Sequence, residues 1–210
     1  EGGRAVIGET TEWLGAEHLL ARRAATPEVA EAITAAAQRR ERMAVEAGID
    51  LTGSNPGPTN IRAGLSSIEE QSLGAVARSG GRPVRGVLAY AGAPPGPGLY
   101  VMDGPSYTPE SLTGFTAAGA QLLLFTTGVG NSFVSALAPT IKVSANPETC
   151  RRLEAQLDFR ADAAFDGREA LEAAAARLYA TVLDVASGTL TWGEVPNEGE
   201  EVVSRFGPAL

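Results

Sequence analysis

Short apolar runs alternate with longer amphipathic segments along most of the chain. The apolar runs predicted to be strands are 4–8, 99–102, 121–125 and 140–144. The segments predicted to be helices are 27–48, 67–79, 108–118, 147–157 and 167–187, while 83–91 fits either type. Strands that alternate with helices of ten or more residues are typical of a parallel sheet. The pattern therefore predicts an α/β fold, a parallel sheet flanked by helices, as a single domain over 1–195 with an irregular acidic tail over 196–210.

Two of these elements carry particularly clear local signals. The helix over 27–48 has Thr26 as a candidate N-cap, Pro27 at its first position and Gly48 after its end. The run QLLLF at 121–125 is continuously apolar, as parallel strands covered on both faces tend to be. We therefore expect the strand over 121–125 to be buried on both faces.

Composition and charge narrow the classes of partner. The 210 residues are 44% hydrophobic with a formal net charge of −8, which argues against nucleic acid or an anionic membrane as partner. A small anionic substrate stays open, because a few arginines suffice for a local positive site. The single cysteine, Cys150, excludes an internal disulfide framework and fits a reducing cytoplasm. Because a glycine turn and a strand open the sequence without a lead-in, we expect a piece of a longer chain.

The segment ETTEWLGAEH at 9–18 directly follows the first predicted strand. Ligands of open parallel sheets bind at the carboxyl ends of the strands, which indicates the loops after Gly8, Met102, Phe125 and Ser144. Glu9, Glu12, Glu17 and His18 offer oxygen and nitrogen donors suited to Mg²⁺, Mn²⁺ or Fe²⁺. The alternative is that Glu17 and His18 lie on the exposed side of a helix entry.

The segment over 53–74 is rich in proline, glycine and hydrogen-bonding side chains. It predicts an extended loop carrying Asn55, Thr59, Asn60 and Arg62, followed by a capped helix start. Such a loop before a helix N-terminus suits an oxygen-rich anion. The alternative is structural: Ser66 or Ser67 with Glu69 or Glu70 forms a capping box, and the asparagines form Asx turns.

The segment FTTGVGNSF at 125–133 leaves the strand over 121–125 through a glycine-rich turn that carries Thr126, Thr127 and Asn131. Backbone N–H groups of such a turn can hold a carboxylate or phosphate. The segment matches a dinucleotide fingerprint poorly, because Phe133 stands where a glycine is needed. A tight connection without ligand is the alternative.

Lys142 is the sole lysine and lies within the apolar run PTIKV. A lysine in a buried strand needs a partner or a lowered pKa, which makes it a candidate for charge stabilisation or proton transfer. The alternative is that its side chain extends from the strand end to solvent.

Five segments in this order resemble the C-terminal part of the altronate/galactarate dehydratase family of sugar-acid dehydratases. They are GETTEWLGAEHLL (8–20), SNPGPTNIRAGLSSIEEQSLGAVARSG (54–80), LLLFTTGVGNSF (122–133), APTIKVSAN (138–146) and ASGTLTWGEV (186–195). The resemblance implies a Rossmann-like α/β domain of a cytoplasmic hydro-lyase that converts an aldonic or aldaric acid into a 2-keto-3-deoxy acid. It also implies a divalent metal, usually Fe²⁺, and additional N-terminal domains of the same chain; homo-oligomers are compatible with it.

The resemblance also suggests roles for the candidate residues. They are metal ligation by Glu9 and Glu17, catalysis by Glu70, Lys142 and His18, and substrate binding by Asn55, Asn60, Arg62, Thr126, Thr127 and Asn131. Because some relatives eliminate sulfite from sulfolactate, the resemblance does not fix the leaving group.

Two positions depart from the family pattern. Relatives usually carry a lysine at the place of Gln71 and an arginine at the place of Val129. Loss of a charged group's interaction with a carboxylate costs about 1.5–3 kcal/mol. These departures support a rival hypothesis, a non-catalytic anion-binding or assembly domain with the same fold.

Overall fold

The structure is a computed structural model that describes residues 2–51, 56–62 and 64–202. The chain divides into two compact units, one formed by the described residues up to Ala118 and the other by Gly119–Val202. We call them unit 1 and unit 2 and describe each by itself. The predicted α/β class with parallel strands flanked by helices is confirmed, and the strands form one three-stranded sheet in each unit. The domain boundary predicted after residue 195 stays a prediction.

The sheet of unit 1 places three strand ends at one edge. It consists of β1 (Arg4–Ile7), β2 (Val84–Leu88) and β3 (Gly98–Met102) in the order β1-β3-β2, with all pairs parallel. The ambiguous segment 83–91 is thus a strand. Ile7 pairs with Val101 and Leu88 with Met102, so the loops that follow the three strands leave from the same edge.

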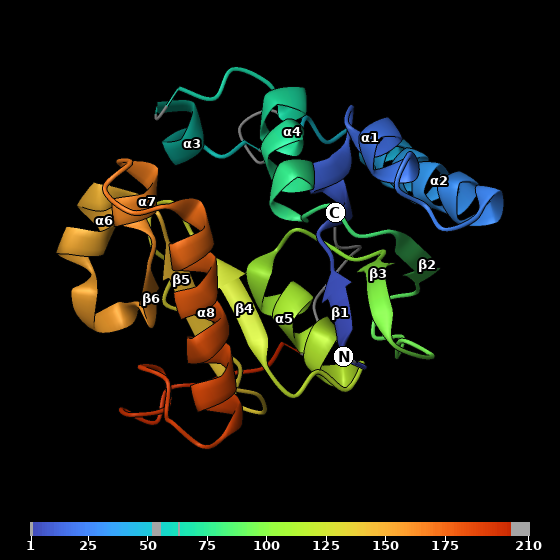
Figure 1. Cartoon of the computed structure of the whole chain (residues 1–210). Helices are drawn as coiled ribbons and strands as arrows, with labels where there is room; N and C mark the ends of the chain where they lie inside the picture. The colour runs from blue at the N-terminus through green and yellow to red at the C-terminus, as the bar shows by residue number, and fades with distance from the viewer. Residues whose placement is uncertain (1, 52–55, 63, 203–210) are drawn as a thin grey trace. The chain divides into compact units, whose positions relative to one another are not determined.

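Six helices belong to the described part of unit 1 (Figure 1). They are the 3₁₀ helix η1 (Thr10–Trp13) and the α-helices α1 (Glu17–Ala21), α2 (Pro27–Glu46), α3 (Pro58–Arg62), α4 (Ile68–Arg78) and α5 (Thr108–Ala117). The predicted N-cap of α2 is confirmed, because Thr26 Oγ1 accepts a hydrogen bond from Val29 N at 3.4 Å. Ser67 caps α4 by accepting from Glu70 N at 3.2 Å.

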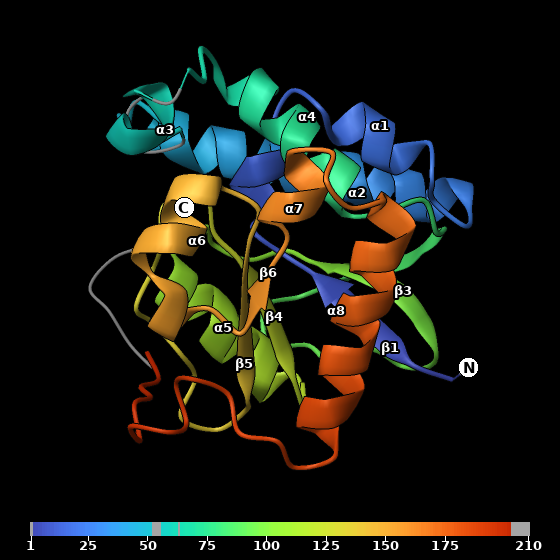
Figure 2. The same cartoon turned by 60° about the vertical axis from the view of Figure 1, so that its left-hand side comes forward.

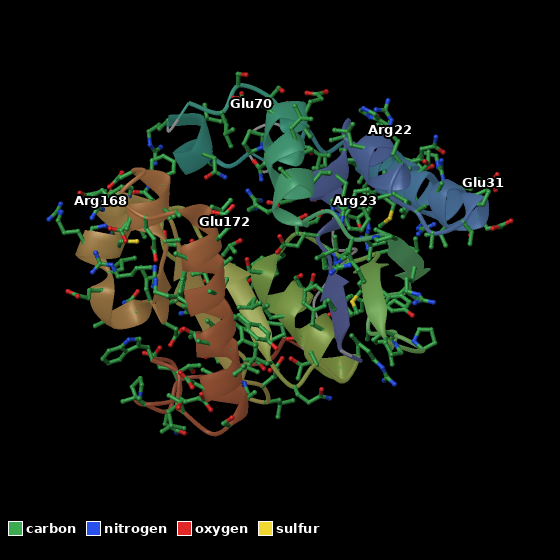
Figure 3. All side chains as sticks on the ribbon, in the orientation of Figure 1. Arg22, Arg23, Glu31, Glu70, Arg168 and Glu172 are labelled. Carbon is green, nitrogen blue, oxygen red and sulfur yellow. The ribbon has the colours of Figure 1, made fainter. Side chains whose placement is uncertain are left out.

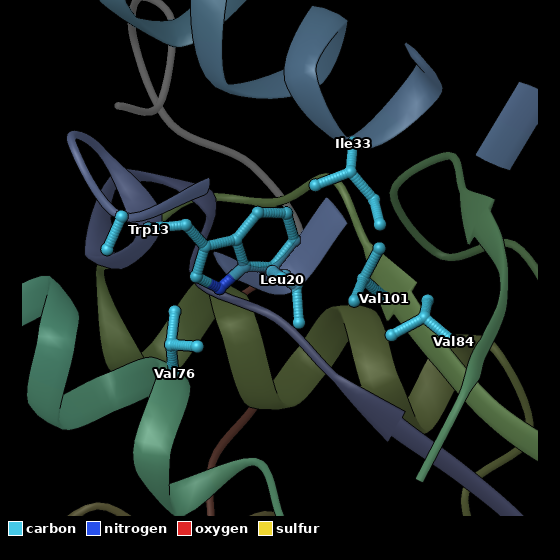
Figure 4. Packing of buried hydrophobic residues seen from close by; sticks show 7 residues of the cluster. Trp13, Leu20, Ile33, Val76, Val84 and Val101 are labelled. Carbon is cyan, nitrogen blue, oxygen red and sulfur yellow. The ribbon is translucent and has the colours of Figure 1, made fainter. Parts of the chain in front are cut away.

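The core of unit 1 joins these helices to the sheet. Buried side chains from η1, α1, α2 and α4 meet those of β2 and β3, and Figure 4 shows the cluster of Trp13, Ala16, Leu20, Ile33, Val76, Val84 and Val101. Ile33 and Val76 hold α2 and α4 on the sheet. Because each fully buried aliphatic or aromatic side chain contributes about 1.5–3 kcal/mol, this cluster fixes the elements around the strand ends.

Unit 2 repeats the parallel arrangement on a smaller scale (Figure 2). Its sheet has the order β4-β5-β6, formed by β4 (Leu123–Thr126), β5 (Thr140–Ser144) and β6 (Phe159–Arg160). Its helices are α6 (Pro147–Arg152), the 3₁₀ helix η2 (Glu154–Gln156), α7 (Asp162–Phe165) and α8 (Leu171–Ala186). Phe159 and Val185 join β6 and α8 in its core.

The structure differs from the sequence prediction in several elements. Leu124 in β4 is 51% exposed, so the expectation of a strand covered on both faces is wrong. The helix predicted over 147–157 ends at Arg152 and gives way to η2, and the two-residue strand β6 was missed. The segment predicted as an extended loop contains the helical turn α3, which begins at Pro58 because proline is suited to a first helical position.

None of the helices in the described residues combines the length and hydrophobicity needed to cross a bilayer.

Candidate active site

The loops after β1 and β3 are tied together at the carboxyl edge of the unit 1 sheet. Thr10 N donates to Gly104 O at 3.0 Å, and Gly104 N donates back to Thr10 Oγ1 at 3.0 Å. The hydroxyls of Thr11 and Ser106 share a further hydrogen bond. Two of the loops that the strand pattern indicated therefore lie side by side, with acidic residues on both.

Glu9 is the most strongly perturbed acid at this edge. Its backbone is left-handed, with φ 64° and ψ 66°, a conformation that costs a residue other than glycine about 1–3 kcal/mol. Burial raises the pKa of Glu9 to about 8, the negative charge of Glu12 adds to the rise, and Arg78 opposes it. At neutral pH Glu9 therefore carries a proton that it can donate.

Glu12, in η1, is held by two residues of α4. Gln71 Nε2 donates to Glu12 Oε1 at 2.8 Å, and Arg78 donates to Glu12 Oε2 at 3.4 Å. The edge thus pairs a protonated acid, Glu9, with a carboxylate that is fixed in place.

Asp103, the first residue after β3, was not singled out from the sequence. It is 9% exposed, and its Oδ1 accepts from Thr10 Oγ1 at 2.9 Å and from Arg40 Nε at 3.0 Å. Its Oδ2 accepts from Arg39 Nε at 3.0 Å. Burial alone would raise the pKa of Asp103, but the bonds from Arg39, Arg40 and Thr10 outweigh it and lower the pKa. Its position directly after a predicted strand was the available signal.

Glu17 and His18 begin α1 and differ in their surroundings. His18 is exposed, as the structural alternative expected for a helix entry. Glu17 is partly buried, and its Oε2 atom is buried without a hydrogen-bond partner among the described residues. A buried carboxylate oxygen without a partner is costly and therefore marks a place where a ligand or water would be stabilising.

The predicted metal site is not assembled from these residues alone. Across the ranges that the structure describes, no group of three or more His, Cys, Asp or Glu side chains lies close enough together to hold a metal ion. Metal ligation by Glu9 and Glu17 stays a prediction that would require further donors.

The segment before α4 forms the capping box that the sequence offered as the structural alternative. Ser66 N and Ser66 Oγ donate to Glu70 Oε2 at 2.8 and 2.7 Å, and Ser67 caps the helix. The bonds from the Ser66 hydroxyl and backbone lower the pKa of Glu70, which lies exposed at the start of α4 (Figure 3). A catalytic role of Glu70 stays a prediction.

The predicted substrate-binding residues of this segment have different positions. Asn60 and Arg62 belong to α3 rather than to an extended loop, and Arg62 is exposed. Asn55 lies outside the described residues. Binding roles of all three stay predictions.

In unit 2, the glycine-rich turn after β4 is held by its own side chains. Thr127 Oγ1 accepts from Gly130 N at 3.0 Å, and Asn131 Oδ1 accepts from Phe133 N at 2.9 Å. Thr126, at the end of β4, is exposed. Substrate binding by Thr126, Thr127 and Asn131 stays a prediction, and the last two also stabilise the turn.

Lys142 lies in the middle of β5 with only 5% of its surface exposed. Its Nζ donates to Ser132 O at 2.9 Å, so the alternative of a side chain extended to solvent is wrong. Burial lowers the pKa of Lys142, against the opposing charges of Glu198 and Asp158. Both expectations for a buried lysine, a partner and a lowered pKa, are confirmed.

The structure thus groups the candidates within their units. Unit 1 brings Glu9 and Glu12 together with Gln71 and Arg78, and it adds Asp103. Thr126, Thr127, Asn131 and Lys142 belong to unit 2. Unit 1 therefore offers the acid–base chemistry, and unit 2 offers a buried amine and a polar turn.

Comparison with known proteins agrees with the resemblance found from the sequence. The family described as D-galactarate/Altronate dehydratase, C-terminal, matches residues 1–208. The chain is 36% identical over 208 residues to the (2R)-sulfolactate sulfo-lyase subunit beta of Chromohalobacter salexigens, covering 98% of this chain and 54% of that protein.

Two dehydratases are also similar. Identity is 30% over 210 residues to the altronate dehydratase of Bacillus subtilis, covering 100% of this chain and 42% of that protein. Identity is 30% over 187 residues to the galactarate dehydratase (L-threo-forming) of Escherichia coli, covering 89% of this chain and 36% of that protein. The chain therefore spans about half or less of the length of these relatives.

Proposed function

Because the chain belongs to the D-galactarate/altronate dehydratase C-terminal family, we propose that it is the C-terminal part of a lyase that acts on a hydroxy acid. The family match over 1–208 carries this proposal, and the acid pair at the carboxyl edge of unit 1 supports it. A lyase of this kind breaks a carbon–oxygen or carbon–sulfur bond next to a carbon from which it removes a proton. Proton removal needs a base close to the substrate, and departure of a hydroxyl needs an acid as well.

We further propose that the reaction is dehydration of an aldonic or aldaric acid. A base removes the proton next to the carboxylate, the electrons form a carbon–carbon double bond, and the neighbouring hydroxyl leaves with a proton as water. The enol formed then becomes the 2-keto-3-deoxy acid. Glu9, protonated at neutral pH, suits the group that donates the proton to the leaving hydroxyl.

The other proton and charge roles fall to the remaining candidates. His18 and Glu70 are proposed for proton removal, and Lys142 for stabilising the negative charge that develops beside the carboxylate. Asn55, Asn60, Arg62, Thr126, Thr127 and Asn131 are proposed to bind the substrate's carboxylate and hydroxyls.

A divalent metal, Fe²⁺ or alternatively Mn²⁺ or Mg²⁺, would supply Lewis-acid stabilisation of that charge. The described residues form no three-donor group for it. Glu17, with its unpartnered buried oxygen, would then be part of a site completed by other donors. Ligation by Glu9 requires its ionised carboxylate and is therefore the alternative to its role as proton donor. Loss of bound metal and of turnover together after dialysis against a chelator, with recovery on adding Fe²⁺, is the expected result.

Sulfite elimination is the second candidate, because identity to the sulfo-lyase subunit is 36% against 30% to the two dehydratases. The two reactions differ in what the leaving group needs. Hydroxide is a poor leaving group and requires a proton, whereas sulfite leaves as a stable anion. A protonated Glu9 therefore supports dehydration more than sulfite release.

One experiment separates the two reactions. The full-length protein is incubated under reducing conditions with Fe²⁺ or Mn²⁺ and either a panel of hexonates and hexarates or (2R)-sulfolactate. Formation of 2-keto-3-deoxy acid and release of sulfite are both measured. We expect dehydration that Glu9→Gln lowers at least about a hundredfold, since a positioned acid contributes roughly 10²–10⁴ in rate. Absence of both products across the panel would refute the proposed lyase.

The rival hypothesis of a non-catalytic domain rested on Gln71 and Val129. An arginine lies beside each of these positions: Arg78 donates to the same carboxylate as Gln71, and Arg152 donates to Val129 O at 2.9 Å. Positive charge is therefore present near both places, which favours an active domain. Turnover that appears only in the Q71K/V129R double variant would favour the non-catalytic domain instead.

A further inference from the structure

Thr10 links Asp103 to the backbone beside Glu9. It is fully buried, and its hydroxyl both donates to Asp103 Oδ1 and accepts from Gly104 N. Its own N–H donates to Gly104 O. Three hydrogen bonds therefore fix Thr10 to the first two residues after β3.

Glu9 lies between two fixed points of the backbone. On one side, Ile7 forms the last β1–β3 pair with Val101, and on the other side Thr10 is fixed to the residues after β3. Gly8, between them, is covered by the ring of Phe115, and a Cβ at Gly8 would lie 2.6 Å from the ring's Cζ atom. The backbone at Glu9 is thus held from both ends in a conformation it would not adopt freely.

Asp103 is in turn held by α2. Arg40 and Arg39 donate to its two carboxylate oxygens, one to each. The carboxylate therefore cannot turn away from Thr10 without losing charged hydrogen bonds, which are stronger than neutral ones. The contacts that fix the backbone at Glu9 therefore run from α2 through Asp103 to Thr10.

We propose that Asp103 is a positioning residue that acts through Thr10 to hold the Glu9 carboxyl at the carboxyl edge of β1 and β3. The inference rests on the proposed function, because it gives Asp103 a part in placing the Glu9 carboxyl that the reaction uses. Neither Asp103 nor Thr10 is required to touch the substrate.

The test uses the full-length protein with three threonine variants. Thr10→Val removes the hydroxyl at nearly constant shape, and Thr10→Ser keeps it. Thr34→Val is the matched control, because the Thr34 hydroxyl donates to Ala30 O within α2, away from the residues that hold Glu9. All are assayed for kcat and KM at a temperature where circular dichroism shows each variant folded.

We expect Thr10→Val to lower kcat about tenfold or more with KM within about threefold, because misplacing a carboxyl that takes part in the reaction affects the transition state most. Thr10→Ser and Thr34→Val should stay within about threefold of the wild-type kcat. Asp103→Asn, which keeps the size but loses the charge, should resemble Thr10→Val. Equal kcat in Thr10→Val and Thr10→Ser would overturn the proposal.

Amide hydrogen exchange gives a readout that does not depend on turnover. The Thr10 and Gly104 amides should exchange about tenfold faster in Thr10→Val and Asp103→Asn than in Thr34→Val. Unchanged exchange would overturn the positioning role even if the enzyme is active. If exchange is accelerated but the protein turns over none of the tested acids, the positioning of Glu9 by Thr10 and Asp103 is supported. In that case only the proposed function is refuted.

Discussion

Gln71 Nε2 donates to Glu12 Oε1 across 2.8 Å, so an uncharged amide of α4 holds a carboxylate of η1. The family resemblance leads us to expect a lysine at this position. The amide fixes the position of Glu12 without adding charge, which leaves Arg78 as the cation that opposes the raised pKa of Glu9. A cation at position 71 would oppose the raised pKa of Glu9 together with Arg78.

Gln71→Lys should lower the pKa of Glu9 from about 8. The added ammonium lies near Glu12 and Glu9, and a positive charge favours the ionised form of a carboxyl. The pKa is followed by NMR titration of glutamate carboxyl carbons in the wild type, with Glu9→Gln assigning the signal. Gln71→Met, which has similar size and no charge, is the control and should leave the titration of Glu9 above pH 6. A titration unchanged by the lysine would contradict the arrangement.

Glu9→Gln should flatten the pH dependence of stability and make the protein more stable than the wild type at pH 8. The pKa of Glu9 is raised from 4.5 to about 8 on folding, so between these values the native state binds more protons than the unfolded state. Stability from this group is therefore lost as the pH rises through that window, by at most about 1.4 kcal/mol per pH unit. Urea unfolding at pH 5, 6.5 and 8 measures the slope. Identical slopes in variant and wild type would rule out the raised pKa.

Arg40→Met should destabilise the protein far more than Arg39→Met. Both arginines bond to Asp103, but the Arg40 side chain is 10% exposed and that of Arg39 is 49% exposed. Removing one partner of a buried ion pair costs about 3–5 kcal/mol, whereas an exposed pair contributes about 0–1 kcal/mol. Thermal unfolding of the two variants gives the comparison. Equal losses would mean that the Asp103 network is not buried as described.

Local patterns predicted most elements of the fold. The strand over 140–144 and the helix starting at Pro27 were predicted at the residues where they begin, because an apolar run or a cap with proline marks them. The two-residue β6 has no pattern of its own and exists only through pairing with β5. The division of the strands into two sheets likewise depends on pairings between distant segments, which no local pattern records.

The site was predictable only where one segment carries it. Glu9 was indicated because an acid directly after a strand lies at the ligand-binding edge. Asp103 satisfies the same rule, yet its importance depends on Arg39 and Arg40, which lie 64 and 63 residues away in the chain. The Gln71–Glu12 contact spans 59 residues. Such long-range partners hold these carboxylates in place, and a single sequence does not show them.

The last prediction separates the two roles open to Glu70, which were both anticipated from the sequence. As a capping residue, Glu70 accepts from Ser66 N and Ser66 Oγ, so Glu70→Ala should lower the stability of the protein measurably. Glu70→Gln keeps an oxygen that can accept both bonds and should lose less stability than Glu70→Ala.

Turnover by the same two variants then tests catalysis. Because hydrogen bonds lower the pKa of Glu70, it is ionised at neutral pH and could act only as the base, not as the acid. A base is abolished by Glu70→Gln even though the cap survives, so kcat should fall about a hundredfold or more at nearly unchanged stability. If kcat instead follows stability, so that Glu70→Ala is impaired and Glu70→Gln is not, Glu70 serves the helix alone and proton removal falls to another group.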